Sequence, residues 1–109
     1  MRKLRNLDQV EEEYLREHPE EIDAYLQTVF EEYAEHGDEK ALLSSLRVIS
    51  RVKGVTAIAE DAGMSRKGLQ KALSDEGNPH FSNVTAIVRA MGYRLMPEPL
   101  NSLESSSAS

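Results

Sequence analysis

Apolar side chains recur every three or four residues along most of this chain, which is the period of an α-helix that buries one face. The clearest case lies within residues 20–35, where the inward positions are Ile22, Tyr25, Leu26, Val29, Phe30 and Tyr33. The same period predicts further helices over residues 7–17, 39–53, 55–62, 65–73 and about 83–91. No segment alternates for long enough to form a sheet alone, so we predict an all-α fold, a compact helical bundle.

Capping and turn residues predict where several of these helices begin and end. Gly37 is expected to end one helix in a left-handed conformation, and Asp38 to cap the next. Ser65 and Ser82 are natural N-caps for two later helices. After the last helix, residues Tyr93–Met96 are expected to extend as a brief C-terminal strand before two prolines stop it.

The first predicted helix has both an apolar stripe and a run of glutamates. Leu7, Val10 and Tyr14 share one face, and the glutamates at positions 11–13 project away from it. We therefore expect the stripe to lie in the core or at an interface. The acidic run is expected to be a solvated helix face rather than a set of acid–base catalysts.

Length and composition limit the kind of protein that this chain can form. A chain of 109 residues fits one domain, and 39% hydrophobic residues are too many for a wholly disordered protein. The absence of cysteine excludes a disulfide framework, a thiolate zinc site and a cysteine nucleophile. No apolar run approaches the roughly 18 residues of a membrane span, so we expect a cytoplasmic protein with no membrane partner.

The formal net charge of −6 is divided unevenly along the chain. Residues 1–40 hold five Lys or Arg against thirteen Asp or Glu, a net charge of −8, whereas residues 41–94 hold eight against four, a net charge of +4. Such an asymmetry indicates two surfaces with different partners. The average charge therefore does not exclude a polyanion as the partner of the basic half.

Residues 55–73, VTAIAEDAGMSRKGLQKAL, have the spacing of a helix-turn-helix unit. Ala59 supplies the small residue where the two helices cross, and Gly63 supplies the tight turn between them. Long hydrogen-bond donors remain on the outer face of the second helix: Arg66, Lys67, Gln70 and Lys71. Such donors read base edges in a major groove, where Arg or Lys pairs with guanine and Gln with adenine. The alternative is a helical hairpin with a solvated basic face, which leaves the positive charge of this half unexplained.

Four longer segments carry a family resemblance: YLREHPEEIDAYL at 14–26, HGDEKALLSSLRVISRVKG at 36–54, AEDAGMSRKGLQKALSDEGNP at 59–79 and FSNVTAIVRAMGYRL at 81–95. Over residues 2–95 the chain resembles the probable addiction-module antidote proteins, a branch of the Xre/Cro-like helix-turn-helix regulators of prophage and toxin–antitoxin operons. The resemblance implies a lambda-repressor-like DNA-binding domain, dimeric operator binding and, in many members, a toxin of the RelE/ParE superfamily as partner. The residues that match the recognition helix are Ser65, Arg66, Lys67, Gln70 and Lys71.

Three positions depart from the family pattern. Gly68 and Gln70 replace residues that are usually larger or aromatic, which suggests an altered base preference. Thr56, with the alanine after it, stands where relatives often have a Gln. We divide the chain into an acidic helical segment at 1–37, a helix-turn-helix DNA-binding domain at 38–96 and a disordered Ser-rich tail at 97–109.

We predict a sequence-specific DNA-binding regulator, an antitoxin that represses its own operon as a homodimer bound to double-stranded operator DNA. Asn78, which follows the second motif helix, either donates to a phosphate or stabilises its loop, and Arg47, Arg51 and Lys53 are weaker phosphate candidates. The alternative is an interaction module whose acidic half neutralises a small basic RelE/ParE-like toxin, with DNA binding secondary or lost. The three histidines are too dispersed for a metal site, so we predict no metal. No convergent set of catalytic groups can be named, so we also predict no cofactor and no enzymatic activity.

Overall fold

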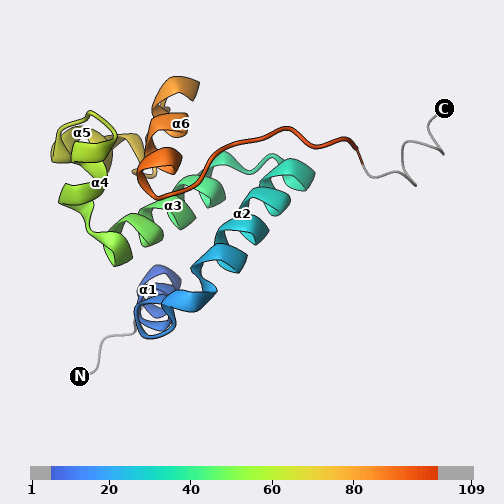
Figure 1. Cartoon of the computed structure of the whole chain (residues 1–109), viewed down its shortest axis with the longest axis horizontal. Helices are drawn as coiled ribbons and strands as arrows, with labels where there is room; N and C mark the ends of the chain where they lie inside the picture. Colours follow the sequence, from blue (N-terminus) through green and yellow to red (C-terminus); the bar gives the residue numbers. More distant parts are fainter. Residues whose placement is uncertain (1–5, 101–109) are drawn as a thin grey trace.

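Helices dominate the part of the chain that the structure describes, residues 6–100 of the computed structural model (Figure 1). In chain order the elements are α1 (Leu7–Glu17), the 3-10 turn η1 (Pro19–Glu21), α2 (Ile22–His36), α3 (Glu39–Lys53), α4 (Val55–Asp61), α5 (Arg66–Ala72) and α6 (Phe81–Ala90). The predicted all-α fold is confirmed. Within residues 6–100, no helix has both the length and the apolar character needed to cross a membrane.

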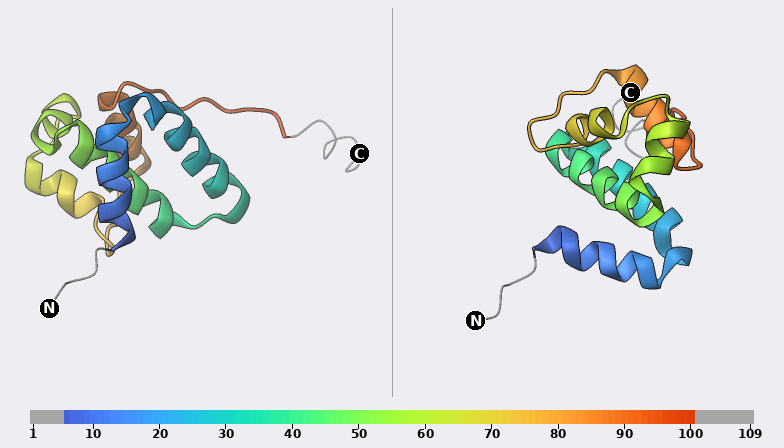
Figure 2. Two further views of the ribbon diagram at one scale, coloured as in Figure 1. Left: turned by 90° about the horizontal axis from the view of Figure 1, so that it is seen from below. Right: turned by 90° about the vertical axis from the view of Figure 1, so that its left-hand side faces the viewer.

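Helix α3 is at the centre of the packing. It contacts α1 and α2, and also α4, which in turn packs on α5 and α6. Figure 2 shows α1 on one side of α3 and α6 on the other. Leu46, Val48 and Ile49 of α3 are fully buried, in a hydrophobic cluster to which all six α-helices contribute. The two short helices α4 and α5 are therefore supported by the same core as the longer ones.

The capping predictions are confirmed at one long helix and wrong at another. The Asp38 carboxylate accepts a hydrogen bond from the N–H three residues later at 3.1 Å, as an N-cap of α3 should. Ser82 does not cap α6, because that helix begins at Phe81 with His80 at the N-cap position. The His80 carbonyl already accepts from the Val84 N–H at 3.1 Å, which places Ser82 inside the first turn.

Helix α1 presents to solvent the apolar face that was predicted to lie in the core or at an interface. Its stripe of Leu7, Val10 and Tyr14 is 70%, 44% and 46% exposed, and its one buried side chain is Leu15. Two of the three glutamates that were predicted to be solvated, at positions 11 and 12, are half-buried. The stripe is therefore not part of the core, and its place at an interface stays a prediction. Helix α1 packs on the bundle through buried Leu15 and through the polar residues of its inner face.

Polar contacts hold the inner face of α1 against the bundle. The Asp8 carboxylate accepts hydrogen bonds from Ser44 Oγ at 2.9 Å and from Arg47 Nη2 at 3.1 Å, both on α3. Glu11 accepts one from the Tyr25 hydroxyl of α2 at 2.9 Å, and burial of that hydroxyl raises the pKa of Tyr25 above its ordinary value. The acidic side chains therefore fix the orientation of α1.

The segment after α6 does not form the predicted strand. Residues Tyr93–Met96 run back across the bundle, and within residues 6–100 there is no strand to pair with them (Figure 1). The Tyr93 hydroxyl donates a hydrogen bond to the Asp23 carboxylate of α2, and burial together with this bond raises the pKa of Tyr93 to about 12. Of the predicted Ser-rich tail, residues 101–109 lie outside the described residues.

Candidate nucleic-acid interface

Helices α4 and α5 meet at a tight turn, as their spacing predicts. Ala59 is only 2% exposed, and Gly63 takes a left-handed conformation, φ 74°, that a side chain would strain. The Met64 N–H donates to the Ala59 carbonyl at 2.9 Å and closes the turn. Leu69 is 1% exposed, so one side of α5 is anchored in the core while the opposite side faces solvent.

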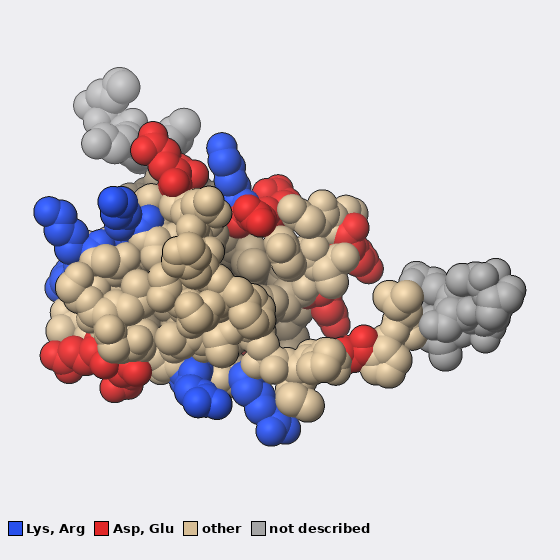
Figure 3. Space-filling model, turned by 90° about the horizontal axis from the view of Figure 1, so that it is seen from above, with Lys and Arg blue, Asp and Glu red and all other residues tan. Residues whose placement is uncertain are grey.

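The predicted site residues at the start and on the outer side of α5 are all exposed: Ser65, Arg66, Lys67, Gln70 and Lys71. Ser65 Oγ accepts from the Gly68 N–H at 2.9 Å, so this residue is the N-cap. Side chains four residues apart share a helix face, which aligns Arg66 with Gln70 and Lys67 with Lys71. Figure 3 shows basic side chains projecting at the end of the molecule that α4 and α5 form, together with acidic side chains on the same end.

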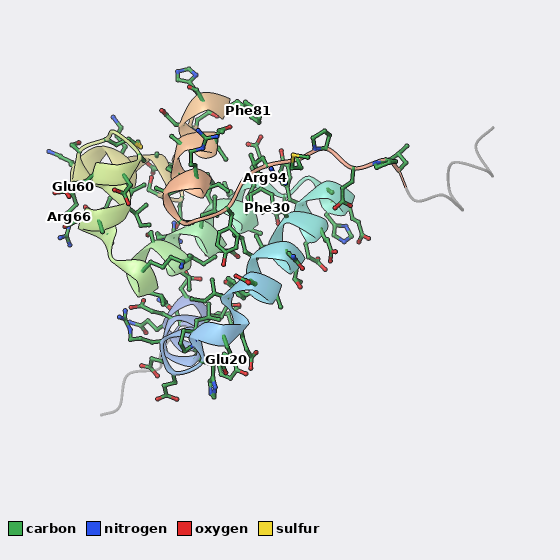
Figure 4. The ribbon with its side chains drawn as sticks, viewed as in Figure 1. Glu20, Phe30, Glu60, Arg66, Phe81 and Arg94 are labelled. Carbon is green, nitrogen blue, oxygen red and sulfur yellow. The ribbon has the colours of Figure 1, made fainter. Side chains whose placement is uncertain are left out.

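Arg66 is positioned by helix α4. Its Nη1 donates a hydrogen bond to Thr56 Oγ1 at 3.1 Å. Figure 4 shows Arg66 at the outer end of the molecule, on the same side as Glu60 and remote from Arg94. Thr56 had no predicted role. The sequence shows at this position only a hydroxyl in the first turn of α4, which does not predict a contact with Arg66. The contact forms because the turn at Gly63 brings the start of α5 next to α4.

Asn78 lies outside α5, exposed on the loop between α5 and α6. The loop passes close to the end of α5, since a Cβ added to Gly77 would lie 2.2 Å from the Ala72 carbonyl oxygen. Asn78 therefore follows the C-terminal end of α5, whereas Arg66 is at its N-terminal end.

The arginines of α3 that were weaker phosphate candidates already face acceptors. Arg47, whose side chain is 20% exposed, donates to the Leu73 carbonyl at 2.5 Å and to the Asp8 carboxylate at 3.1 Å. Arg51 Nη1 lies 3.8 Å from a carboxylate oxygen of Glu12. Both carboxylates belong to α1, which sequence reasoning assigned to a separate acidic surface. In this arrangement Arg47 is held by acceptors on two other elements, whereas the Arg51 side chain stays 40% exposed.

An open hollow of about 560 Å³ lies between α1, α3 and the C-terminal end of α5. Its lining residues are Asn6, Asp8, Gln9, Glu12, Arg47, Arg51, Gln70, Ser74 and Asp75. Gln70 therefore shares its surroundings with three carboxylates and with the guanidiniums of Arg47 and Arg51, whereas Arg66 and Lys67 lie outside the hollow. These charges largely pair with one another, because Arg47 faces two of the carboxylates and Arg51 the third. The predicted site thus has an open basic N-terminal end, and its C-terminal end adjoins a hollow of paired charges with one carboxylate in excess.

One histidine, at the turn between α1 and α2, is grouped with two carboxylates in a way that could hold a metal ion. His18, Glu20 and Glu21 bring three potential ligand atoms within 4.8 Å of one another. Local contacts account for the grouping: His18 Nδ1 is 3.5 Å from Glu20, and Glu21 accepts a hydrogen bond from the Tyr14 hydroxyl at 2.7 Å. Both glutamates are exposed, and exposed acidic groups of this kind are common without a metal.

Comparison with known proteins gives the chain a family. The model for the family described as probable addiction module antidote protein matches residues 3–99, which include every element from α1 to α6. An uncharacterized protein of Haemophilus influenzae strain Rd is 42% identical over 72 residues, which is 66% of this chain and 70% of the relative. No solved structure gives a significant match. With a family match of this extent, the chain belongs to the probable addiction module antidote proteins.

Proposed function

We propose that this antidote protein is a DNA-binding repressor of the Xre/Cro-like helix-turn-helix kind, and that it acts as a homodimer on the operator of its own operon. The observation that carries the proposal is helix α5: it is anchored by buried Leu69, closed onto α4 at Gly63, and exposes Arg66, Lys67, Gln70 and Lys71. A rigid helix with long donors on its free side suits a major groove. A single helix of seven residues reads only a few base pairs, and a dimer would place two such helices in two half-sites of the operator.

In this proposal, the N-terminal end of α5 is the end that approaches the bases. Arg66 and Lys67 lie outside the acidic hollow, and Arg66 is already held by Thr56. Gln70 lines that hollow, where three carboxylates outnumber two guanidiniums, so its contribution to base reading is the smaller one. Lys71 and Asn78 would contact phosphates on the side of the duplex away from α1. Residues 38–96 form the DNA-binding domain, and residues 1–37 form an acidic segment packed on it.

Alanine substitutions along α5 test the proposal. Arg66→Ala or Lys67→Ala is expected to cost about 1–3 kcal/mol on the duplex upstream of the protein's own gene and less on a random duplex. Gln70→Ala should cost less than either. Arg94→Ala is the matched control, because it removes an exposed cation remote from α5 (Figure 4). Equal losses for Arg94→Ala and Arg66→Ala, measured by fluorescence anisotropy, would contradict the proposal.

A second candidate function is the neutralisation of a small basic toxin by the acidic segment. The exposed apolar stripe of α1 favours this function, because a row of three large apolar side chains exposed on one helix face is typical of a protein-binding surface. The two functions use opposite charges and different helices, so one chain can carry both.

A further inference from the structure

The free face of α1 carries an apolar stripe that nothing in the described chain covers. Leu7, Val10 and Tyr14 stand at positions i, i+3 and i+7, which places them in one row along the helix. They are half of the large apolar side chains that are exposed within residues 6–100. The others, Phe81, Met96 and Leu100, are spread over α6 and the segment that follows it. Helix α1 thus presents the densest exposed apolar surface of the described chain.

The stripe is held in place rather than left to rotate. The hydrogen bonds of Asp8 and Glu11 fix the opposite face of α1 on the bundle. The Tyr14 ring packs on His18, with ring centroids 4.4 Å apart, and its hydroxyl donates to Glu21 at 2.7 Å. The helix therefore cannot turn its stripe inward without breaking these contacts. A partner would meet a preorganised row of anchors, which lowers the entropy cost of binding.

The charge around the stripe identifies the kind of partner. Residues 7–21 hold seven carboxylates and a single cation, Arg16. Asp8 and Glu12 face arginines of α3, whereas Glu17 and Glu20 are exposed beside the free face. A second copy would bring an equally acidic rim, and a nucleic acid would bring phosphates, so both would be repelled. A protein with a basic rim around an apolar groove matches the surface in both charge and polarity.

We propose that the outer face of α1, formed by Leu7, Val10 and Tyr14, is the docking surface for a basic protein that receives the helix in an apolar groove. This inference rests on the antidote role, because the partner in question is the toxin of the same addiction module. It adds the helix, the anchors and the electrostatic character of the contact. The contact is distinct from the DNA-binding face on α5.

The test measures toxin affinity and DNA affinity on the same full-length variants. The protein encoded by the gene adjacent to this one is co-expressed with the chain, separated from it under denaturing conditions and refolded. It is then titrated by calorimetry against the wild-type protein and Leu7→Glu/Val10→Glu. The double variant is expected to bind the toxin at least about 100-fold more weakly, since helix anchors in a groove carry most of the affinity. Phe81→Glu is the control, because it introduces a carboxylate at an exposed apolar position on α6, away from the stripe. Glu17→Lys/Glu20→Lys should slow association and weaken its salt dependence.

Each result separates this inference from the proposed function. Unchanged toxin affinity in Leu7→Glu/Val10→Glu, with wild-type binding intact, would overturn the docking surface and leave the antidote role standing. Equal losses in that variant and in Phe81→Glu would also overturn it. No toxin binding by the wild-type protein would overturn both the antidote role and the docking surface. The affinity for operator DNA, measured separately on the same protein, would still test the proposed DNA binding. A change of oligomeric state with unchanged toxin affinity would make the stripe a contact between copies and contradict the inference.

Discussion

Arg66 is the residue on which the proposed base contact most depends, and its guanidinium is held by the hydroxyl of Thr56 at 3.1 Å. Thr56→Val keeps the shape of the side chain and removes that acceptor. We expect operator affinity to fall by about 1 kcal/mol, less than for Arg66→Ala, because the arginine remains but is less well positioned. Fluorescence anisotropy on operator and random duplexes would show this as a loss of discrimination. An unchanged ratio between the two duplexes would mean that Thr56 does not position Arg66 for reading.

Gly77 is required by a close approach of two backbone segments. A Cβ there would lie 2.2 Å from the Ala72 carbonyl oxygen and 2.9 Å from that of Lys71, and backbone atoms cannot move aside as a flexible side chain can. Gly77→Ala should therefore destabilise the fold by about 1–3 kcal/mol, measured by urea unfolding. Glu76→Ala, at the exposed neighbouring position, is the control and should stay within about 0.5 kcal/mol. Equal stabilities of the two variants would contradict the close approach.

At the scale of the element, α1 is fastened by its carboxylates. Asp8→Asn with Glu12→Gln removes the negative partners of Arg47 and Arg51. We expect faster hydrogen exchange throughout α1 and a loss of about 1–3 kcal/mol in the free energy of unfolding. Binding to random DNA should strengthen at the same time, because two cations lose their carboxylate partners.

The control for this pair is Glu17→Gln, which removes a charge from an exposed position of the same helix. It should leave both the hydrogen exchange of α1 and the affinity for random DNA nearly unchanged. If Glu17→Gln loosens α1 as much as the double variant does, net charge rather than pairing would hold the helix.

The segment after α6 is held on α2 by the hydrogen bond from the Tyr93 hydroxyl to Asp23, which only the neutral form of Tyr93 can donate. The pKa of Tyr93 is raised from 10 to about 12, so its contribution to stability is present below pH 10 and is lost as the pH rises from about 10 to about 12. The difference between the absorbance titrations of wild-type protein and Tyr93→Phe at about 295 nm should therefore have a midpoint well above 10. A midpoint near 10 would show that the hydroxyl is not held by Asp23 in solution.

The helices could be predicted from the sequence because apolar period and capping are local properties. Helix α3 spans Glu39–Lys53 as predicted, and Gly63 and Ser65 take the conformations that their chemistry implies. The orientation of α1 could not be predicted from its own residues. It depends on Ser44, Arg47 and Tyr25, polar groups of other helices that turn the acidic face inward. For the same reason, the carboxylates beside Gln70 appear only in the folded structure.

At the scale of the whole molecule, the two charged halves of the sequence are partly paired with each other. Two carboxylates of α1 lie next to two arginines of α3, so these opposite charges neutralise each other within the protein. Three exposed cations lie on α5, at its N-terminal end and on its outer side, and the exposed apolar stripe lies on α1. A duplex on α5 and a basic protein on α1 would therefore meet surfaces of opposite character on one small bundle.

Sequence-specific DNA binding is the central proposal, and the affinity ratio between two duplexes tests it most directly. Fluorescence anisotropy would compare a labelled duplex from upstream of the protein's own gene with a shuffled duplex of the same composition, at about 0.15 M salt. We predict that the wild-type protein binds the upstream duplex at least about 1,000-fold more tightly, with the affinity falling as salt rises. Equal affinities for the two duplexes, or no binding to either, would contradict the proposal.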